Sequence, residues 1–134
     1  AVTGPAATVL RIDPRTLAVT DRIAIGTRPG VLSLQPIGVA TDAEFVWVLN
    51  GNTATVTKID PELHAVVAML PLGRGSIGLA AGHGAAWVSN EYDGTVTRID
   101  AETDAMTSIT VAPHDRPTDV TVAGGLVWVS VDET

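Results

Sequence analysis

The sequence predicts an all-β protein built from consecutive β-propeller blades, and three observations support this prediction. The first is an internal repeat, because Trp47, Trp87 and Trp128 each precede a valine and recur at intervals of about 40 residues. The second is residue choice, since Val, Ile, Thr and Trp are frequent in the repeat and alternate with period two. The third is that Gly, Pro and Asp-Pro corners interrupt the repeat, and no stretch of it shows the apolar periodicity of a helix. A β-type repeat of this length is typical of four-stranded antiparallel blades.

Composition sets the broad class of the chain. Its 134 residues are 46% hydrophobic and 17% charged, which predicts one globular domain. The net charge is −7, so we expect no nucleic-acid partner and no attraction to anionic membranes. There is no cysteine, which excludes disulfides and thiolate chemistry. No apolar run reaches the roughly 18 residues that predict membrane insertion, and the layout of the first residues suggests a mature or excised piece.

The repeats have an unusual phase. The segment 8–26 matches only the third and fourth strands of a blade, whereas 36–73 and 76–112 each fit a full blade of four strands. The segment 117–131 matches only the first and second strands. We therefore interpret 1–134 as a single propeller segment with three repeats' worth of strands, phased as a half blade, two full blades and a half blade.

This phase predicts partners for the sheet edges. Propellers have about 4 to 8 blades, so three repeats do not close a ring and would leave sheet edges and blade faces open. Two explanations fit the sequence. The chain is joined to the rest of a longer propeller chain, or two copies form a homodimer that closes a six-bladed ring by strand exchange.

Several recurring residues have structural interpretations. The tryptophans lie within strands between apolar neighbours, so we interpret them as packing anchors between blades rather than as ligand platforms. An aspartate ends each predicted third strand and is expected to accept amide hydrogens of the turn that follows; these residues are Asp13, Asp60 and Asp100. A basic residue stands two positions earlier and is expected to cover apolar edges with its stem while its head stays in water; these residues are Arg11, Lys58 and Arg98.

One end of the propeller is the predicted ligand face. Turns between the second and third strands share this end with the linkers between blades, and loops carry function more often than the scaffold does. An arginine recurs in each linker, which suits carboxylate or phosphate ligands; the alternative is that each arginine pairs with a nearby carboxylate. The candidate ligand-binding residues are Arg28, Arg74, Arg116, Asn50, Asn90 and Tyr92.

Catalytic chemistry finds little support in the residues. The three histidines lie in unrelated places, no His-Glu-x-x-His or paired metal-ligand spacing occurs, and the carboxylates lie mostly at turns. We therefore expect no catalytic residue, no metal and no cofactor. If the chain is an enzyme, His114 and Glu91 are the candidate catalytic residues, because both belong to the predicted ligand face.

The block WVSNEYDGTVTRIDAETDA, with FVWVLN, TVTKIDPEL and IAIGTRP, resembles repeats of the bacterial YVTN-type (YncE-like) β-propellers. This resemblance implies an extracytoplasmic protein, secreted, periplasmic or on the cell surface. It implies little about function, since such propellers are mostly non-catalytic or uncharacterised. The streptogramin lyase branch is similar in its Trp-bearing strand and Arg-Ile-Asp word, and it implies a histidine and a metal-binding glutamate on the same face. The predicted function is thus a binding scaffold for an unknown protein or a small anionic ligand, and the alternative is a lyase-like or lactonase-like enzyme.

Overall fold

The structure is a computed structural model that describes residues 7–26, 34–111 and 114–133. These residues form twelve β-strands and no helix, and therefore no helix that could cross a membrane. The strands are β1 (Thr8–Ile12), β2 (Val19–Ala24), β3 (Pro36–Thr41), β4 (Val46–Asn50), β5 (Thr55–Asp60), β6 (Ala65–Pro71), β7 (Ser76–Gly82), β8 (Ala85–Asn90), β9 (Thr95–Asp100), β10 (Met106–Thr110), β11 (Arg116–Ala123) and β12 (Leu126–Asp132).

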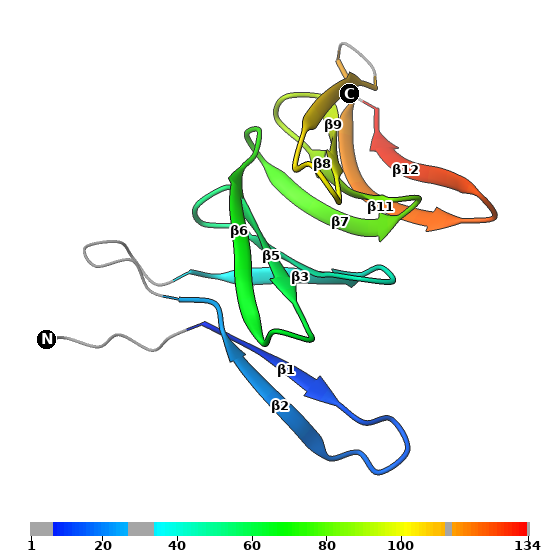
Figure 1. The fold of residues 1–134 in the computed structure, drawn as a ribbon. Helices are drawn as coiled ribbons and strands as arrows, with labels where there is room; N and C mark the ends of the chain where they lie inside the picture. The colour runs from blue at the N-terminus through cyan, green and yellow to red at the C-terminus, as the bar shows by residue number, and fades with distance from the viewer. Residues whose placement is uncertain (1–6, 27–33, 112–113, 134) are drawn as a thin grey trace, which may run out of the picture.

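The strands form four antiparallel sheets that follow one another along the chain (Figure 1). Two sheets are complete blades, with strand orders β3-β4-β5-β6 and β7-β8-β9-β10, and we call them blades 2 and 3. The pairs β1-β2 and β11-β12 are the half blades 1 and 4. The predicted all-β fold and its phase of half, full, full and half blade are confirmed.

The inner strands β3, β7 and β11 contact one another in succession, so the blades radiate from a common line. Each inner strand has a register shift near its start, which skips Ile37, Ile77 and Thr118. Gly78 follows the second of these bulges, and a Cβ there would lie 2.9 Å from the Cα of Asp119. Glycine is therefore required where β7 and β11 approach each other.

The hydrophobic core lies between blades rather than inside one sheet. Trp47 is fully buried at the boundary of blades 2 and 3, as the packing interpretation expects. Its cluster comprises Trp47, Leu49 and Val56 from blade 2 with Ala86, Val88, Ile99 and Ala101 from blade 3. A second cluster joins blades 1 and 2 and comprises Ile23, Ile25, Val48 and Ile59. The middle strand β4 of blade 2 thus buries both of its faces, with Val48 packed against blade 1 and Trp47 and Leu49 packed against blade 3.

The corners between third and fourth strands are built alike in blades 1, 2 and 3. The aspartate carboxylate accepts amide hydrogens from the next residues, as in Asp100, whose Oδ1 accepts from Glu102 at 2.9 Å and Thr103 at 3.0 Å. The main-chain bond from Thr103 and then that from Glu102 lower the pKa of Asp100 below its ordinary value. Four residues after each aspartate the backbone has positive φ, at Leu17 (59°), His64 (52°) and Asp104 (62°).

Lys58 corrects one expectation about the basic residues. Its Nζ donates to the carbonyl oxygen of Ala101 at 2.6 Å and to Asp104 Oδ1 at 2.8 Å, so its head crosses from blade 2 to blade 3. It also lies 4.1 Å from the ring centroid of Phe45. The side chain is only 6% exposed, so the expectation that its head stays in water is wrong.

Candidate functional site

The linkers and the turns between second and third strands lie at one end of the blades, which we call the linker face. Backbone hydrogen bonds hold each turn against the linker beside it. Gly51 N donates to Gln35 O at 3.0 Å, and Glu91 N donates to Gly75 O at 2.8 Å. Equivalent bonds in two blades make this face a fixed surface on which side chains of neighbouring loops meet.

Asn90 is buried and joins three strands of blade 3. Its Nδ2 donates to Thr97 Oγ1 at 2.8 Å and to Thr95 Oγ1 at 3.2 Å, and its Oδ1 accepts from Ser76 Oγ at 2.8 Å. All polar atoms of the amide therefore have partners inside the blade. Asn90 is a predicted ligand-binding residue, but its side chain is turned into the sheet and has no exposed surface.

Asn50 occupies the same position in blade 2 and is equally buried. Its Nδ2 donates to Thr57 Oγ1 at 2.9 Å, yet its Oδ1 has no hydrogen-bond partner. The strand register explains the difference, because Pro36 stands opposite Asn50 where Ser76 stands opposite Asn90. Proline has no donor to offer. Neither asparagine is therefore presented to a ligand on this face.

The turn Glu91-Tyr92-Asp93 brings arginines from two linkers together. Arg74 binds Asp93, with its backbone N 2.8 Å from Oδ2 and its Nε 3.2 Å from Oδ1. The main-chain bond, more than the side-chain bond and the nearby charge, lowers the pKa of Asp93 below its ordinary value. Arg116 pairs with Glu91, with 3.7 Å between its Nη1 and Oε1. Arg74 and Arg116 therefore each pair with a nearby carboxylate, which is the alternative interpretation of the linker arginines.

Tyr92 stands between these two ion pairs and is 67% exposed. Its position depends on Gly75, which has a φ of +74° and lies against it. A Cβ at Gly75 would lie 2.8 Å from Tyr92 N and 2.7 Å from the ring carbon Cδ2. The linker thus fits under the aromatic residue only with glycine at this position.

The other predicted site residues are Arg28, His114 and Glu91. Arg28 lies outside the described residues. His114 is exposed at the start of the last linker segment, and Glu91 is engaged by Arg116. In the described parts of the chain, no group of three or more His, Asp or Glu side chains is placed to hold a metal ion.

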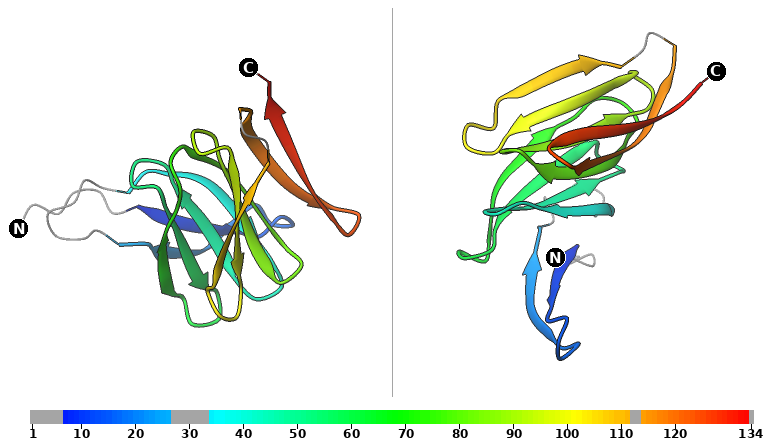
Figure 2. Two further views of the ribbon diagram at one scale, coloured as in Figure 1. Left: turned by 90° about the horizontal axis from the view of Figure 1, so that it is seen from above. Right: turned by 90° about the vertical axis from the view of Figure 1, so that its right-hand side faces the viewer.

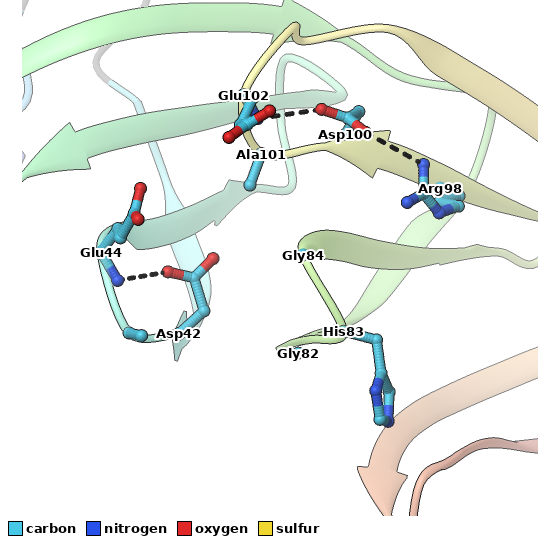
Figure 3. A pocket seen from close by; sticks show the side chains of 10 residues that line it. Asp42, Glu44, Gly82, His83, Gly84, Arg98, Asp100, Ala101 and Glu102 are labelled. Carbon is cyan, nitrogen blue, oxygen red and sulfur yellow. Dashed lines mark hydrogen bonds and ion pairs between the residues drawn. The ribbon is translucent and has the colours of Figure 1, made fainter.

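A hollow of about 440 Å³ lies at the opposite end of the blades, between blades 2 and 3 (Figure 3). Sequence reasoning did not single it out, because its lining comes from three short turns that are far apart in sequence. The lining residues include Asp42, Glu44, His83, Arg98, Asp100 and Glu102.

The carboxylates of this hollow are held by their own turns. Asp42 Oδ1 accepts from Glu44 N at 2.8 Å, and its Oδ2 accepts from Trp47 Nε1 at 3.0 Å. Asp100 accepts from its own turn and lies 3.6 Å from Arg98 Nη1. Figure 3 shows the ring of His83 pointing away from the carboxylates. Within this hollow, His83 therefore does not face the carboxylates of Asp42 or Asp100.

Comparison with known proteins supports the fold. No protein-family model and no curated protein sequence matches the chain. Solved structures do match. Hydrazine synthase of Kuenenia stuttgartiensis matches with a TM-score of 0.69 and 22% identity, over 84% of this chain and 32% of that one.

Two further structures are similar over most of this chain. A catalytically inactive virginiamycin B lyase from Staphylococcus aureus with quinupristin has a TM-score of 0.71 and 15% identity, over 92% of this chain and 41% of that one. Glutaminyl cyclase of Myxococcus xanthus has a TM-score of 0.57 and 12% identity, over 85% and 48%. These neighbours are propeller-like. The chain folds as a segment of a β-propeller. It spans less than half the length of each of these three neighbours, and at such identities the likeness describes the fold alone.

Proposed function

We propose that the chain is a binding module that takes a small anionic ligand with a planar ring on the linker face, beside Tyr92. The observation that supports this is the turn Glu91-Tyr92-Asp93, which holds one arginine from each adjacent linker. Guanidinium groups are suited to carboxylate or phosphate, and the exposed phenol ring offers a face for stacking.

Arg116 can also exchange the carboxylate of Glu91 for the carboxylate of a ligand. Arg116 reaches Glu91 through one contact of 3.7 Å, longer than a good charge-assisted hydrogen bond, and both side chains keep access to solvent. An incoming carboxylate can therefore bind the remaining N–H donors of Arg116 in the bidentate geometry that a guanidinium favours. Arg74 is held more firmly, because its main chain and its side chain both bind Asp93. We assign ligand contact to Arg116 and Tyr92, and support of the turn to Arg74.

The proposal is tested by titrating the ¹⁵N-labelled chain with benzoate and with inorganic phosphate, using benzyl alcohol as the uncharged control. Amide shifts are expected to change at residues 74–75, 91–93 and 116 with benzoate, and less with phosphate, which cannot stack. Arg116→Ala is expected to weaken benzoate binding about tenfold, since a hydrogen bond to a charged group contributes roughly 1.5–3 kcal/mol. Tyr92→Ala removes the stacking contact and is expected to weaken benzoate binding without changing that of phosphate.

Arg15→Ala is the matched control, because Arg15 is also exposed but lies in the corner at the opposite end of blade 1. It is expected to leave both titrations unchanged. Equal shifts over the whole surface, or benzoate affinity that Arg116→Ala and Arg15→Ala lower alike, would show that the linker face is not the binding site.

A further inference from the structure

We propose that a second hollow between blades 2 and 3, beside Asp93, binds a neutral sugar ring. Blades 2 and 3 lie side by side in every view (Figures 1 and 2), and both are complete four-stranded sheets. The hollow has a volume of about 450 Å³, within the range of about 300–1,000 Å³ that small-molecule sites have. We call it the hydroxyl hollow, and the lining residues that matter here are Leu72, Asp93, Thr95, Thr97, Met106 and Ser108. The proposal is independent of the anionic ligand proposed beside Tyr92.

Strand geometry places three hydroxyl groups of this hollow on one face of blade 3. Thr95 and Thr97 are two residues apart on β9, so their side chains lie on the same side of the sheet. Ser108 is paired with Thr97 across β9 and β10, which brings its hydroxyl to that side as well. Ile99, two residues further along β9, packs in the core against blade 2. The three hydroxyl groups therefore lie on the face of blade 3 that is turned toward blade 2.

Asn90 orients the two threonine hydroxyls as donors. Its Nδ2 donates to Thr97 Oγ1 at 2.8 Å and to Thr95 Oγ1 at 3.2 Å, so each oxygen already accepts one hydrogen bond. Each hydroxyl keeps a proton of its own to donate, and neither proton has an acceptor among the residues that the structure describes. Thr97 is only 7% exposed, so its proton needs a partner inside the hollow.

Asp93 adds acceptors at one end of the hollow. Its two oxygens accept from Arg74 N at 2.8 Å and Arg74 Nε at 3.2 Å, and lone pairs remain on both. The guanidinium of Arg74 also balances the charge of this carboxylate. The hollow therefore combines donors and acceptors with a balanced charge. This lining suits a neutral ligand whose polar groups both donate and accept, as hydroxyl groups do.

The arrangement of these groups fits a ring that carries several hydroxyls. Thr95 and Thr97 bind the same amide nitrogen, so their protons require acceptors that are close together on the ligand. A sugar ring has an oxygen on most of its carbons and presents neighbouring acceptors and donors together. Leu72 and Met106 offer apolar surface to the C–H groups of such a ring. Leu72 is fixed in place, because its backbone N donates to Ala54 O at 2.8 Å.

The outer strand of blade 3 supplies a hydroxyl group that blade 2 lacks. Ser108 stands opposite Thr97 in blade 3, whereas Met69 stands opposite Thr57 in blade 2. Ser108 is exposed, and its hydroxyl makes no hydrogen bond to the part of the chain that the structure describes. The blade itself therefore does not require this hydroxyl, and its removal tests ligand contact without a cost to the fold.

The turn of blade 3 also differs from that of blade 2. In blade 2, Thr53 Oγ1 lies 2.8 Å from Thr55 Oγ1, so these two hydroxyls bind each other. In blade 3, Asp93 stands at the position of Thr53, and its carboxylate binds Arg74 instead. The repeat thus provides the same asparagine and threonines in both complete blades, but only blade 3 of these two leaves the threonine protons for a ligand.

Titration of the ¹⁵N-labelled chain with methyl β-D-glucopyranoside tests the proposal. Amide shifts are expected to change at residues 72–73, 93–97 and 106–108. Tetrahydropyran-2-methanol, which has the same ring with a single hydroxyl, is the control ligand and is expected to leave these amides unchanged at equal concentration. N-methylacetamide is the second control, because an amide also donates and accepts. If either control binds as tightly as the glucopyranoside, the hollow does not recognise a sugar and the proposal is overturned.

Ser108→Ala is expected to weaken glucopyranoside binding about threefold, because it removes one neutral hydrogen bond. Thr107→Ala is the matched control, since Thr107 is the neighbouring exposed residue of β10 and its side chain points to the opposite face of the sheet. It is expected to leave binding unchanged. Equal weakening by the two substitutions would place the sugar elsewhere on the blade.

Substitutions at Thr97 separate the hydroxyl from the shape of the side chain. Thr97→Val is expected to weaken glucopyranoside binding about fivefold, whereas Thr97→Ser keeps the hydroxyl and is expected to bind within about twofold of the original. Thermal unfolding verifies that both variants fold. Benzoate binding at Arg116 is expected to be the same in these variants, which separates this site from the one beside Tyr92. No amide shifts up to the solubility limit of the glucopyranoside, or equal losses in both Thr97 variants, would overturn the proposal.

Discussion

Each tryptophan indole donates a hydrogen bond to a residue five positions before it, and this contact fixes the ring against its blade. Trp87 Nε1 donates to Gly82 O at 3.1 Å, and Trp128 Nε1 donates to Ala123 O at 3.2 Å. Trp47 instead uses the carboxylate of Asp42, at 3.0 Å. In blade 2 the acceptor of the indole N–H is therefore a side-chain carboxylate, whereas in blades 3 and 4 it is a backbone carbonyl.

Asp42→Ala is expected to lower the free energy of unfolding by about 1–3 kcal/mol at neutral pH, because the buried indole N–H of Trp47 loses its acceptor. Burial by itself would raise the pKa of Asp42. The hydrogen bonds from Glu44, Phe45 and Trp47 and the charge of Lys58 outweigh burial and hold it below the ordinary value of 3.8.

A carboxyl whose pKa is lower in the folded than in the unfolded chain stabilises the fold above its unfolded pKa, and this contribution is lost as pH falls through the folded pKa. The difference between the original chain and Asp42→Ala, measured by urea denaturation, should therefore shrink as pH falls below about 4. Glu44→Ala is the control, because only the backbone N–H of Glu44 takes part in this turn. A difference that stays constant down to the acid limit would contradict the charged role of Asp42.

Asn50 and Asn90 show why the site was harder to predict than the strands. In the sequence each asparagine follows an apolar word and precedes a polar turn, a pattern typical of an exposed loop residue. Each asparagine is instead the last residue of its strand, β4 or β8, and is still paired with the next strand. Both side chains are buried. Burial of a polar residue depends on a donor or acceptor in another strand, such as Ser76 or Thr97, which local composition does not reveal.

At the scale of elements, contacts between blades are made by residues at equivalent positions with different chemistry. His64, at the positive-φ position of its corner, pairs with Asp21 in β2 of blade 1. Asp104, at the same position of the next corner, binds Lys58 of blade 2. The corner residue of each complete blade therefore reaches back to the preceding blade. At the first boundary the corner supplies a histidine to an aspartate, and at the second it supplies an aspartate to a lysine.

The strand pattern made blades predictable, because period-two alternation and turn residues are local signals. The pairs across blades were not predictable in the same way. Lys58 and Asp104, or Glu91 and Arg116, are separated by many residues and meet only when the blades stack. Sequence repetition showed that a basic residue recurs at Lys58 and Arg98, but not that one would be buried while the other stays partly exposed.

Lys58→Ala is expected to destabilise the chain by about 1.5–3 kcal/mol, since it removes a buried charged donor and leaves the Ala101 carbonyl without it. Arg98→Ala, the same change at the equivalent position of blade 3, is expected to cost less than about 1 kcal/mol, because this partly exposed arginine meets Asp100 only at 3.6 Å. Thermal and urea unfolding of the two variants measure the contrast. Equal losses would show that the contact between blades adds nothing at Lys58.

At the scale of the whole molecule, exposure of the tryptophans follows the number of neighbouring strands and blades. Trp47 faces the complete blade 3 and is fully buried, and Trp87 faces the half blade 4 and is partly exposed. Trp128 is 57% exposed, and within the described residues no third strand pairs with its β12. The same repeated residue thus changes from core to surface along the chain.

Acrylamide quenching of tryptophan fluorescence is expected to follow this order of exposure, because only exposed indoles are quenched efficiently. Trp128→Phe is expected to remove most of the quenchable emission, since the Trp128 side chain is 57% exposed. Trp47→Phe is the matched control and is expected to leave the quenchable emission unchanged, because Trp47 is fully buried. Circular dichroism verifies that both variants fold. If the two variants lose the same quenchable emission, burial of the repeated tryptophan does not depend on the strands and blades that surround it.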